Sequence, residues 1–175
     1  MKTKNKNPGS QKASRPLIPK DYGVPQGEET MLPWAMVEEQ LHQERIYWVC
    51  TVRPDGRPHS VPLWGAWFNE RFYFDGSSQT RHVRNLMENP AVSVHLESGE
   101  EVVIIDGIGR AVGKPDRDLA MGVYKIYKSK YAGYPGYDPT PEMWDEGGLY
   151  EVVPQRVLAW RNFPNDATRW VFVNE

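Results

Sequence analysis

Tight-turn signals divide the chain into short segments that are rich in β-branched and aromatic residues. The first segment, Ile46–Val52, runs into Arg53–Arg57, where Asp55-Gly56 supplies the positive φ angles of a hairpin turn. Asn69-Glu70 and Ser98-Gly99 separate later segments in the same way. We expect strands at Ile46–Val52, from Pro58 to about Phe68, and at Arg71–Phe74, Ala91–Glu97, Glu101–Val112, Leu149–Val153, Val157–Arg161 and Thr168–Val173. Six or more such strands with few helices predict a mainly β fold, an antiparallel barrel or sandwich with flanking helices.

The expected helices lie between these strands. Trp34, Val37 and Leu41 recur at helical spacing, which predicts a helix over residues 32–45 with Thr30 as its cap. A second helix is expected from Asp116 to about Tyr131, followed by a Gly/Pro-rich loop.

Charge is distributed unevenly along the chain. Lys+Arg number 21 and Asp+Glu number 23, yet residues 1–20 carry six basic residues and no acid. Residues 1–30 are also rich in Lys, Asn, Ser, Gly and Pro, which predicts a disordered basic arm before a domain at 31–175. The acidic remainder argues against nucleic acid as a partner of the domain, although a basic arm that recruits nucleic acid or a membrane stays an alternative.

Several classes of protein are disfavoured by what the sequence lacks. No apolar run approaches the roughly 18–20 residues of a membrane span, and the first residues lack the apolar region of a signal peptide. With Cys50 as its one cysteine, the chain cannot form an internal disulfide, so we expect a cytoplasmic protein. The four histidines show no metal-ligand spacing, so no metal site is expected. Gly107 and Gly109 lie inside a strand, where they indicate a bulge or tight bend.

One segment, Phe72–Leu86, has the composition of a phosphate site. An aromatic strand is followed by small hydroxyl residues, and a helix then begins near Thr80. The first turn of a helix offers free N–H groups and a positive dipole end, which bind phosphate well. Ser77 and Thr80 add hydroxyls, and Arg81 and Arg84 add guanidinium groups on one helix face. The alternative is a helix capped by Ser or Thr with two solvated arginines.

A second candidate segment is His59–Trp64, a strand interrupted by a proline. Because Pro62 cannot donate a ladder hydrogen bond, the strand should lie at a sheet edge or contain a bulge. Backbone groups near Ser60–Leu63 would then be open to a planar ligand. Trp64 and Trp67 fit either a ligand platform or the barrel core.

With these two segments, the chain resembles the pyridoxamine 5′-phosphate oxidase-like superfamily, the FMN-binding split β-barrels. The similar region covers roughly Leu41 to Val112 and includes TVRPDGRPHSVPLW, FYFDGSSQTRHVRNLMENPAVSVHL and EVVIIDGIGRA. The ending RVLAWRNFPNDATRWVF also resembles that of flavin- and deazaflavin-binding relatives.

The resemblance implies a homodimer with a flavin in a groove between subunits. It implies that the flavin ring lies along His59, Ser60, Val61, Pro62, Leu63 and Trp64, and that Thr80 and Arg81 hold the phosphate. His82 stands where the family often has Lys, so it either weakens the phosphate anchor or supplies it only when protonated. Arg169 and Trp170 would close the groove, whereas Asn85 and Leu86 would pack the helix.

The expected activity is an oxidoreductase that transfers hydride to or from a small organic substrate. FMN is the expected cofactor and coenzyme F420 the alternative, with Lys125, Lys128 and Lys130 suited either to its anionic tail or to a solvated helix face. The cofactor carries such chemistry, so no catalytic residue needs to be evident. A non-catalytic flavin or haem protein that acts as a sensor or carrier is the other class.

Overall fold

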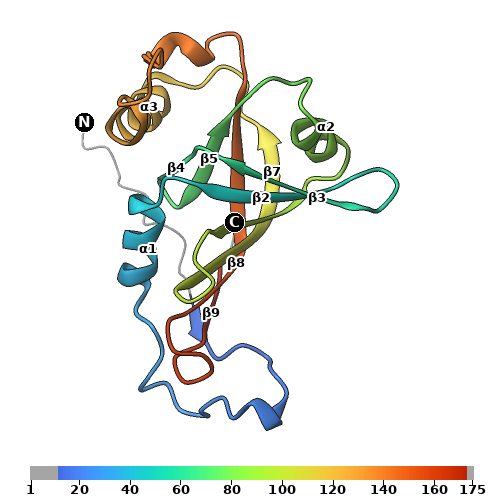
Figure 1. Cartoon of the computed structure of the whole chain (residues 1–175), viewed down its shortest axis with the longest axis vertical. Helices are drawn as coiled ribbons and strands as arrows, with labels where there is room; N and C mark the ends of the chain where they lie inside the picture. The colour runs from blue at the N-terminus through green and yellow to red at the C-terminus, as the bar shows by residue number, and fades with distance from the viewer. Residues whose placement is uncertain (1–11, 173–175) are drawn as a thin grey trace, which may run out of the picture.

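The computed structural model describes residues 12–172, which form a split β-barrel with flanking helices (Figure 1). Nine strands make one antiparallel sheet in the order β1-β9-β8-β7-β6-β2-β3, and β5 joins β4 to β8. The strands are β1 Lys12–Ser14, β2 Tyr47–Val52, β3 Pro58–Leu63, β4 Ala66–Phe68, β5 Arg71–Asp75, β6 Ala91–Leu96, β7 Val102–Ala111, β8 Leu149–Trp160 and β9 Thr168–Val171. The mainly β prediction is confirmed.

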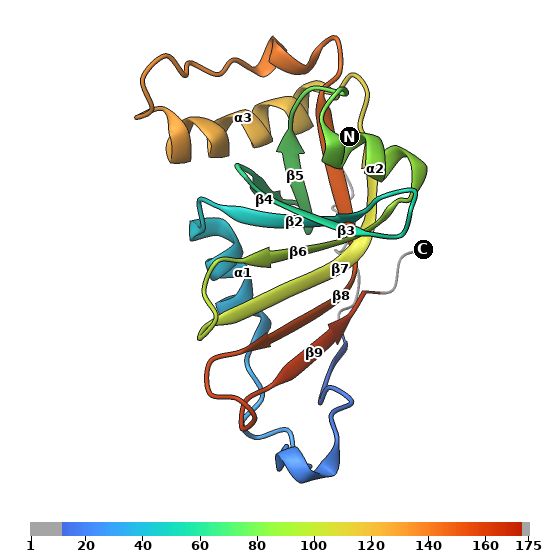
Figure 2. The same ribbon diagram turned by 45° about the vertical axis from the view of Figure 1, so that its right-hand side comes forward.

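Three α-helices surround the sheet at different places. They are α1 Trp34–Gln43, α2 Arg81–Glu88 and α3 Arg117–Tyr131, and short 3₁₀ turns form at Lys20–Tyr22 and Pro141–Trp144. Figures 1 and 2 place α1 along one side, α2 toward the other side and α3 across one end. None of these helices, within residues 12–172, is long and apolar enough to cross a membrane.

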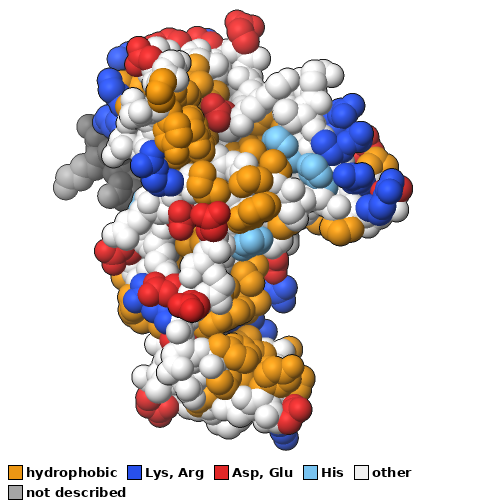
Figure 3. All heavy atoms as spheres, viewed as in Figure 1, with side chains coloured by type: hydrophobic (Ala, Val, Ile, Leu, Met, Phe, Trp, Pro, Cys, Tyr) orange, Lys and Arg blue, Asp and Glu red, His pale blue; other side chains and the backbone are white. Residues whose placement is uncertain are grey.

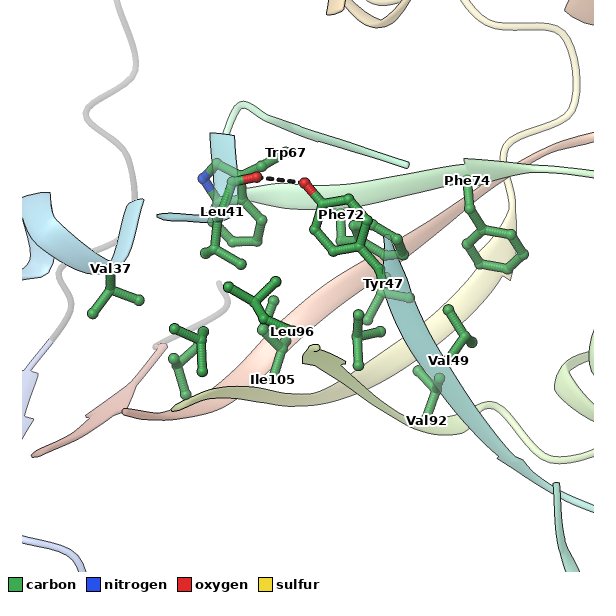
Figure 4. Packing of buried hydrophobic residues seen from close by; sticks show 14 of the residues in the cluster. Val37, Leu41, Tyr47, Val49, Trp67, Phe72, Phe74, Val92, Leu96 and Ile105 are labelled. Carbon is green, nitrogen blue, oxygen red and sulfur yellow. Dashed lines mark hydrogen bonds between the residues drawn. The ribbon is translucent and has the colours of Figure 1, made fainter. Parts of the chain in front are cut away.

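The main core fills the inside of the curved sheet. Inward-facing residues of α1, β2 and β5 point toward one another in Figure 4, and the Tyr47 hydroxyl donates a 2.5 Å hydrogen bond to the Leu41 carbonyl. A second buried cluster, rich in tyrosine, lies under α3. It contains Tyr73, Tyr127 and Tyr131.

A buried carboxylate joins three strands. Glu151 of β8 accepts hydrogen bonds from Arg71 of β5 (2.8 Å) and Arg110 of β7 (2.6 Å). Burial raises the pKa of Glu151, but the two guanidinium groups outweigh it and hold that pKa below its usual value.

Two segments depart from the expected strand boundaries. The strand expected from Pro58 to Phe68 breaks at Trp64-Gly65, and Gly65 lies so close to the Phe72 ring that a Cβ there would be 2.3 Å from it. The two strands expected over 149–161 are one, β8, in which Pro154 is accommodated by a register shift opposite Gly107. This shift confirms the predicted bulge.

The N-terminal segment corrects the prediction of a disordered arm over residues 1–30. Residues 12–14 form β1, which pairs with β9, and the Arg15 guanidinium donates to four oxygens. Thr30 does not cap α1, since its hydroxyl bonds the Asn165 carbonyl at 2.6 Å and the helix begins after Pro33. Residues 12–30 therefore lie against the domain, and residues 1–11 of the expected arm are outside the described part.

Candidate cofactor site

The first part of the site is the open edge of β3. Within residues 12–172 this strand pairs only with β2, and Pro62 lies opposite Trp48. Pro58, Ser60 and Pro62 are exposed, while His59, Val61 and Leu63 are half-buried. The proline thus stands at a sheet edge, as its missing N–H requires.

Trp64 follows β3 and enters an aromatic cluster rather than the main core. Its ring stacks on Tyr131 with centroids 4.5 Å apart and planes 4° apart. Tyr134 and Tyr137 pack on it at 4.7 and 4.9 Å. Trp67, by contrast, is 1% exposed in the main core. Of the two tryptophans, only Trp64 adjoins the open edge.

The second part is the N-terminus of α2, which no side chain caps. Thr80 holds the cap position, but its hydroxyl donates to the Ser77 carbonyl at 2.9 Å. The N-terminus of α3 differs, because the Asp116 carboxylate there accepts the Leu119 N–H at 2.9 Å. The first-turn N–H groups of α2 are therefore left for a ligand or water. The prediction of a Ser- or Thr-capped helix is wrong in this detail.

The side chains at this end of α2 form a cationic group. Arg81 and Arg84 are exposed, and no ion pair joins either of them to a carboxylate within residues 12–172. His82 is 7% exposed, and its Nε2 lies 3.2 Å from the Thr80 hydroxyl. Figure 3 shows Arg and His side chains, with a few acidic ones beside them, gathered where α2 and the β2–β3 hairpin meet the surface.

Buried contacts hold α2 in place. Asn85 is 1% exposed and donates from its amide to the Thr51 hydroxyl of β2 at 3.0 Å. Leu86 packs against Gly109 of β7, where a Cβ would lie 2.3 Å from Leu86 Cδ1. Asn85 and Leu86 thus pack the helix.

Arg169 and Trp170 are not brought to this region within the chain. The Arg169 guanidinium donates to the Ser14 hydroxyl at 3.0 and 3.1 Å, and Trp170 is 2% exposed beside Trp34. Their strand, β9, is separated from β3 by four strands of the sheet. Any contact with a ligand at β3 would require another copy of the chain.

The three lysines of α3 have different environments. Lys125 and Lys128 are exposed, and Lys128 donates to Tyr124 at 3.0 Å. Lys130 is half-buried, donating to the Glu44 carbonyl at 2.6 Å and the Tyr47 hydroxyl at 2.7 Å, and burial lowers its pKa to about 8. Lys130 therefore has a structural role between α3 and the end of α1.

Sequence reasoning did not identify Asp75, the last residue of β5. Its carboxylate accepts a 3.2 Å hydrogen bond from the Tyr127 hydroxyl, and burial raises its pKa. The residue adjoins Gly76, where the candidate phosphate loop begins. No local pattern could have shown this, since Tyr127 is 52 positions away.

Comparisons with known proteins identify the family of the chain. A model of the pyridoxamine 5′-phosphate oxidase family matches residues 34–161, most of the chain. The chain belongs to the pyridoxamine 5′-phosphate oxidase family. The match covers both the β3 edge and the α2 N-terminus. No curated protein sequence matches the chain.

Solved structures of the same fold include proteins with different described roles. The conserved hypothetical protein Rv2991 from Mycobacterium tuberculosis has a TM-score of 0.63 and 22% identity over 78% of this chain and 89% of its own. A structure described as an F420 reductase has a TM-score of 0.53 and 23% identity over 69% and 94%. HutZ, the haem storage protein from Vibrio cholerae, has a TM-score of 0.52 and 20% identity over 69% and 88%. These likenesses establish the fold that the chain shares with them.

In the residues 12–172, no group of three or more His, Cys, Asp or Glu side chains could hold a metal ion. The arrangement instead combines an open strand edge with uncapped N–H groups and arginines. Such a set can bind a planar molecule that carries a phosphate.

Proposed function

We propose that this protein is an FMN-dependent oxidoreductase that transfers hydride to or from a small organic substrate. The observation that carries the proposal is the uncapped N-terminus of α2 with two exposed arginines, beside the open edge of β3. Membership in the pyridoxamine 5′-phosphate oxidase family supports a flavin at this place. Coenzyme F420 is the alternative cofactor, and the F420 reductase with the same fold supports it.

The residues present fit FMN. The first-turn N–H groups of α2 and the Arg81 guanidinium would bind the phosphate, with Ser77, Thr80 and Arg84 around it. Backbone groups of the β3 edge would face the ring, and Trp64 would border it. FMN supplies the redox chemistry when bound, while the protein binds and orients it and limits access of water.

We further propose that the protein acts as a homodimer. Trp48, His95, Ile104 and Leu158 follow one another across four adjacent strands, and all four are half-buried in the single chain. They point away from the core because their neighbours Val49, Val94, Ile105 and Val157 point into it. A row on the outer sheet face in which three of the four side chains are large and apolar suits burial against a second copy. Size-exclusion chromatography with light scattering should give twice the 20.2 kDa chain mass.

The visible spectrum and cofactor titration of the purified protein test the cofactor. A flavin band and saturable FMN binding would support the proposal, and preferential F420 binding would support the alternative. A Soret band would favour haem binding, the second candidate, which the haem storage protein of the same fold supports. A protein that binds none of the three would refute the proposal.

Arg81→Ala tests the phosphate position. Losing one charge-assisted hydrogen bond of about 1.5–3 kcal/mol should weaken FMN binding roughly tenfold to a hundredfold. Arg117→Ala is a matched control, because Arg117 is likewise exposed and is the first residue of α3, whose N-terminus is capped. Riboflavin, which lacks the phosphate, should bind both variants as it binds wild type. Equal FMN affinity in wild type and Arg81→Ala would contradict the assignment.

A further inference from the structure

His82 occupies an unusual position for an ionisable residue, inside the first turn of α2. Its side chain is almost fully buried, and its Nε2 lies 3.2 Å from the Thr80 hydroxyl. The same nitrogen would be 3.8 Å from a Cβ placed on Gly76. Gly76 and Thr80 are the two ends of the loop that joins β5 to α2. The imidazole therefore borders the loop at which the phosphate is proposed to bind.

The groups that neighbour His82 are basic or aromatic. His59, on β3, acts on His82 electrostatically, and Phe74 covers the ring with centroids 6.0 Å apart. Arg81 and Arg84 flank it on α2 itself. Burial, and after it the proximity of His59, lower the pKa of His82. A neutral imidazole is therefore the resting state at neutral pH.

Within residues 12–172, no ion pair joins His82 to a carboxylate. On β5, Asp75 is engaged by Tyr127. On β7, Asp106 is paired with Arg156. On the adjoining part of β2, Thr51 bonds Asn85, and the nearby Asp55 is paired with Arg57 at the hairpin tip.

We propose that His82 is a proton-gated ligand for the phosphoryl group of the cofactor: it takes up a proton as the phosphate binds, so affinity for the phosphate rises as the pH falls. This inference rests on the proposed function, since it requires a phosphorylated cofactor at the β3–α2 site. A bound phosphate stabilises the imidazolium form by charge and by a hydrogen bond, which raises the pKa of His82 in the complex. Proton and phosphate then strengthen each other's binding by the same factor.

The pH window follows from the direction of the two shifts. Free His82 has its pKa below 6.5, and phosphate binding moves it upward. Between the pKa of His82 in the free protein and its pKa in the complex, the affinity for FMN should change by at most about tenfold per pH unit. This is the limit for the uptake of one proton. Above the pKa of the complex the histidine is neutral in both states, and the dependence ends.

The experiment compares FMN with riboflavin by fluorescence titration between about pH 5.5 and 8.5, a range that spans the ordinary histidine pKa. FMN and riboflavin differ by the phosphate, so the ratio of FMN affinity to riboflavin affinity measures the contribution of the phosphate to binding. In wild type this ratio should rise several-fold or more as the pH falls. The ratio of FMN affinity to riboflavin affinity should be low in His82→Gln and high in His82→Lys. In both variants this ratio should change with pH only as FMN itself ionises, since its phosphate has a pKa near 6. His42→Gln is the control, because His42 is exposed on α1, on the side of the molecule away from α2.

NMR titration of the histidine side chains gives a second, independent measurement. The pKa of His82 should rise when FMN binds and stay unchanged with riboflavin, whereas that of His42 on α1 should respond to neither. If FMN binds but the wild-type ratio depends on pH no more than that of His82→Gln, the inference is overturned and the proposed cofactor stands. If neither flavin binds any variant at any pH, the proposed function fails as well.

Discussion

The contact between Gly109 and Leu86 predicts a specific failure of the site when one methyl group is added. In Gly109→Ala the new Cβ would lie 2.3 Å from Leu86 Cδ1 and 2.9 Å from Leu86 Cγ. Carbon atoms pack at about 3.5–4.0 Å, so Leu86 or the whole of α2 must move by more than about 1 Å. Leu86 is 1% exposed and belongs to the main core cluster, so its movement disturbs packed neighbours.

The magnitude follows from overpacking. Inserting a methyl group into a closed core costs about 1–3 kcal/mol. For a chain of this length each kcal/mol lowers Tm by about 2–4 °C, so Tm should fall by about 2–12 °C. FMN affinity should fall as well, because displacement of α2 moves Arg81 and His82.

Thermal unfolding followed by circular dichroism measures the loss. Gly99→Ala is the control, since a Cβ there meets nothing within 4 Å. Leu86→Ala alone should cost about 2–5 kcal/mol through the cavity it leaves. Combining it with Gly109→Ala should cost less than the sum, because the new methyl group then enters that cavity. A Gly109→Ala protein as stable as wild type, or strictly additive changes, would refute this account of how α2 is held.

Four further predictions concern global or local stability. Tyr131→Phe removes the hydroxyl that accepts the buried Gly65 N–H at 2.9 Å, so the free energy of unfolding in urea should fall by about 1–3 kcal/mol; no change would contradict this role. Because the pKa of Glu151 is depressed, its stabilisation is present above its ordinary pKa of about 4.5 and is lost as the pH falls; Glu151→Gln should abolish that acid-side slope, and an unchanged slope would count against it. Burial raises the pKa of Asp75, so Asp75→Asn should be more stable than wild type at neutral pH and should lose this advantage in acid. This pH dependence is opposite to that predicted for Glu151. Arg15→Ala should speed proteolysis and hydrogen exchange of residues 12–30 while the core keeps its protection, and equal rates in both proteins would argue that other contacts hold the segment.

Local chemistry was sufficient to predict most strands and the edge position of β3. Asp55-Gly56 and Asn69-Glu70 do form tight turns, with positive φ at Gly56, Asn69 and Glu70. The missing N–H of Pro62 fixed the place of β3 because only an edge or a bulge tolerates it.

One local contact and two long-range contacts decided what the sequence did not reveal. Thr80 has the composition of a cap, yet its hydroxyl bonds the Ser77 carbonyl instead. Lys130 looks solvated by helical spacing, but the end of α1 buries it. Asp75 became part of the site region through Tyr127, a contact that no window of sequence contains.

The pairing of β1 with β9 has a consequence for how the sheet can open. Ser14 and Arg169, which bond each other here, are 155 positions apart along the chain. Closing so long a loop carries a large entropic cost. Because β1 has three residues, it makes few contacts that offset this cost. We therefore expect β1 to dock last in folding and to detach first. Detachment of β1 would make β9 an edge strand with unpaired backbone N–H and C=O groups. Such an edge can pair with a strand of another chain, which leads to strand exchange or aggregation.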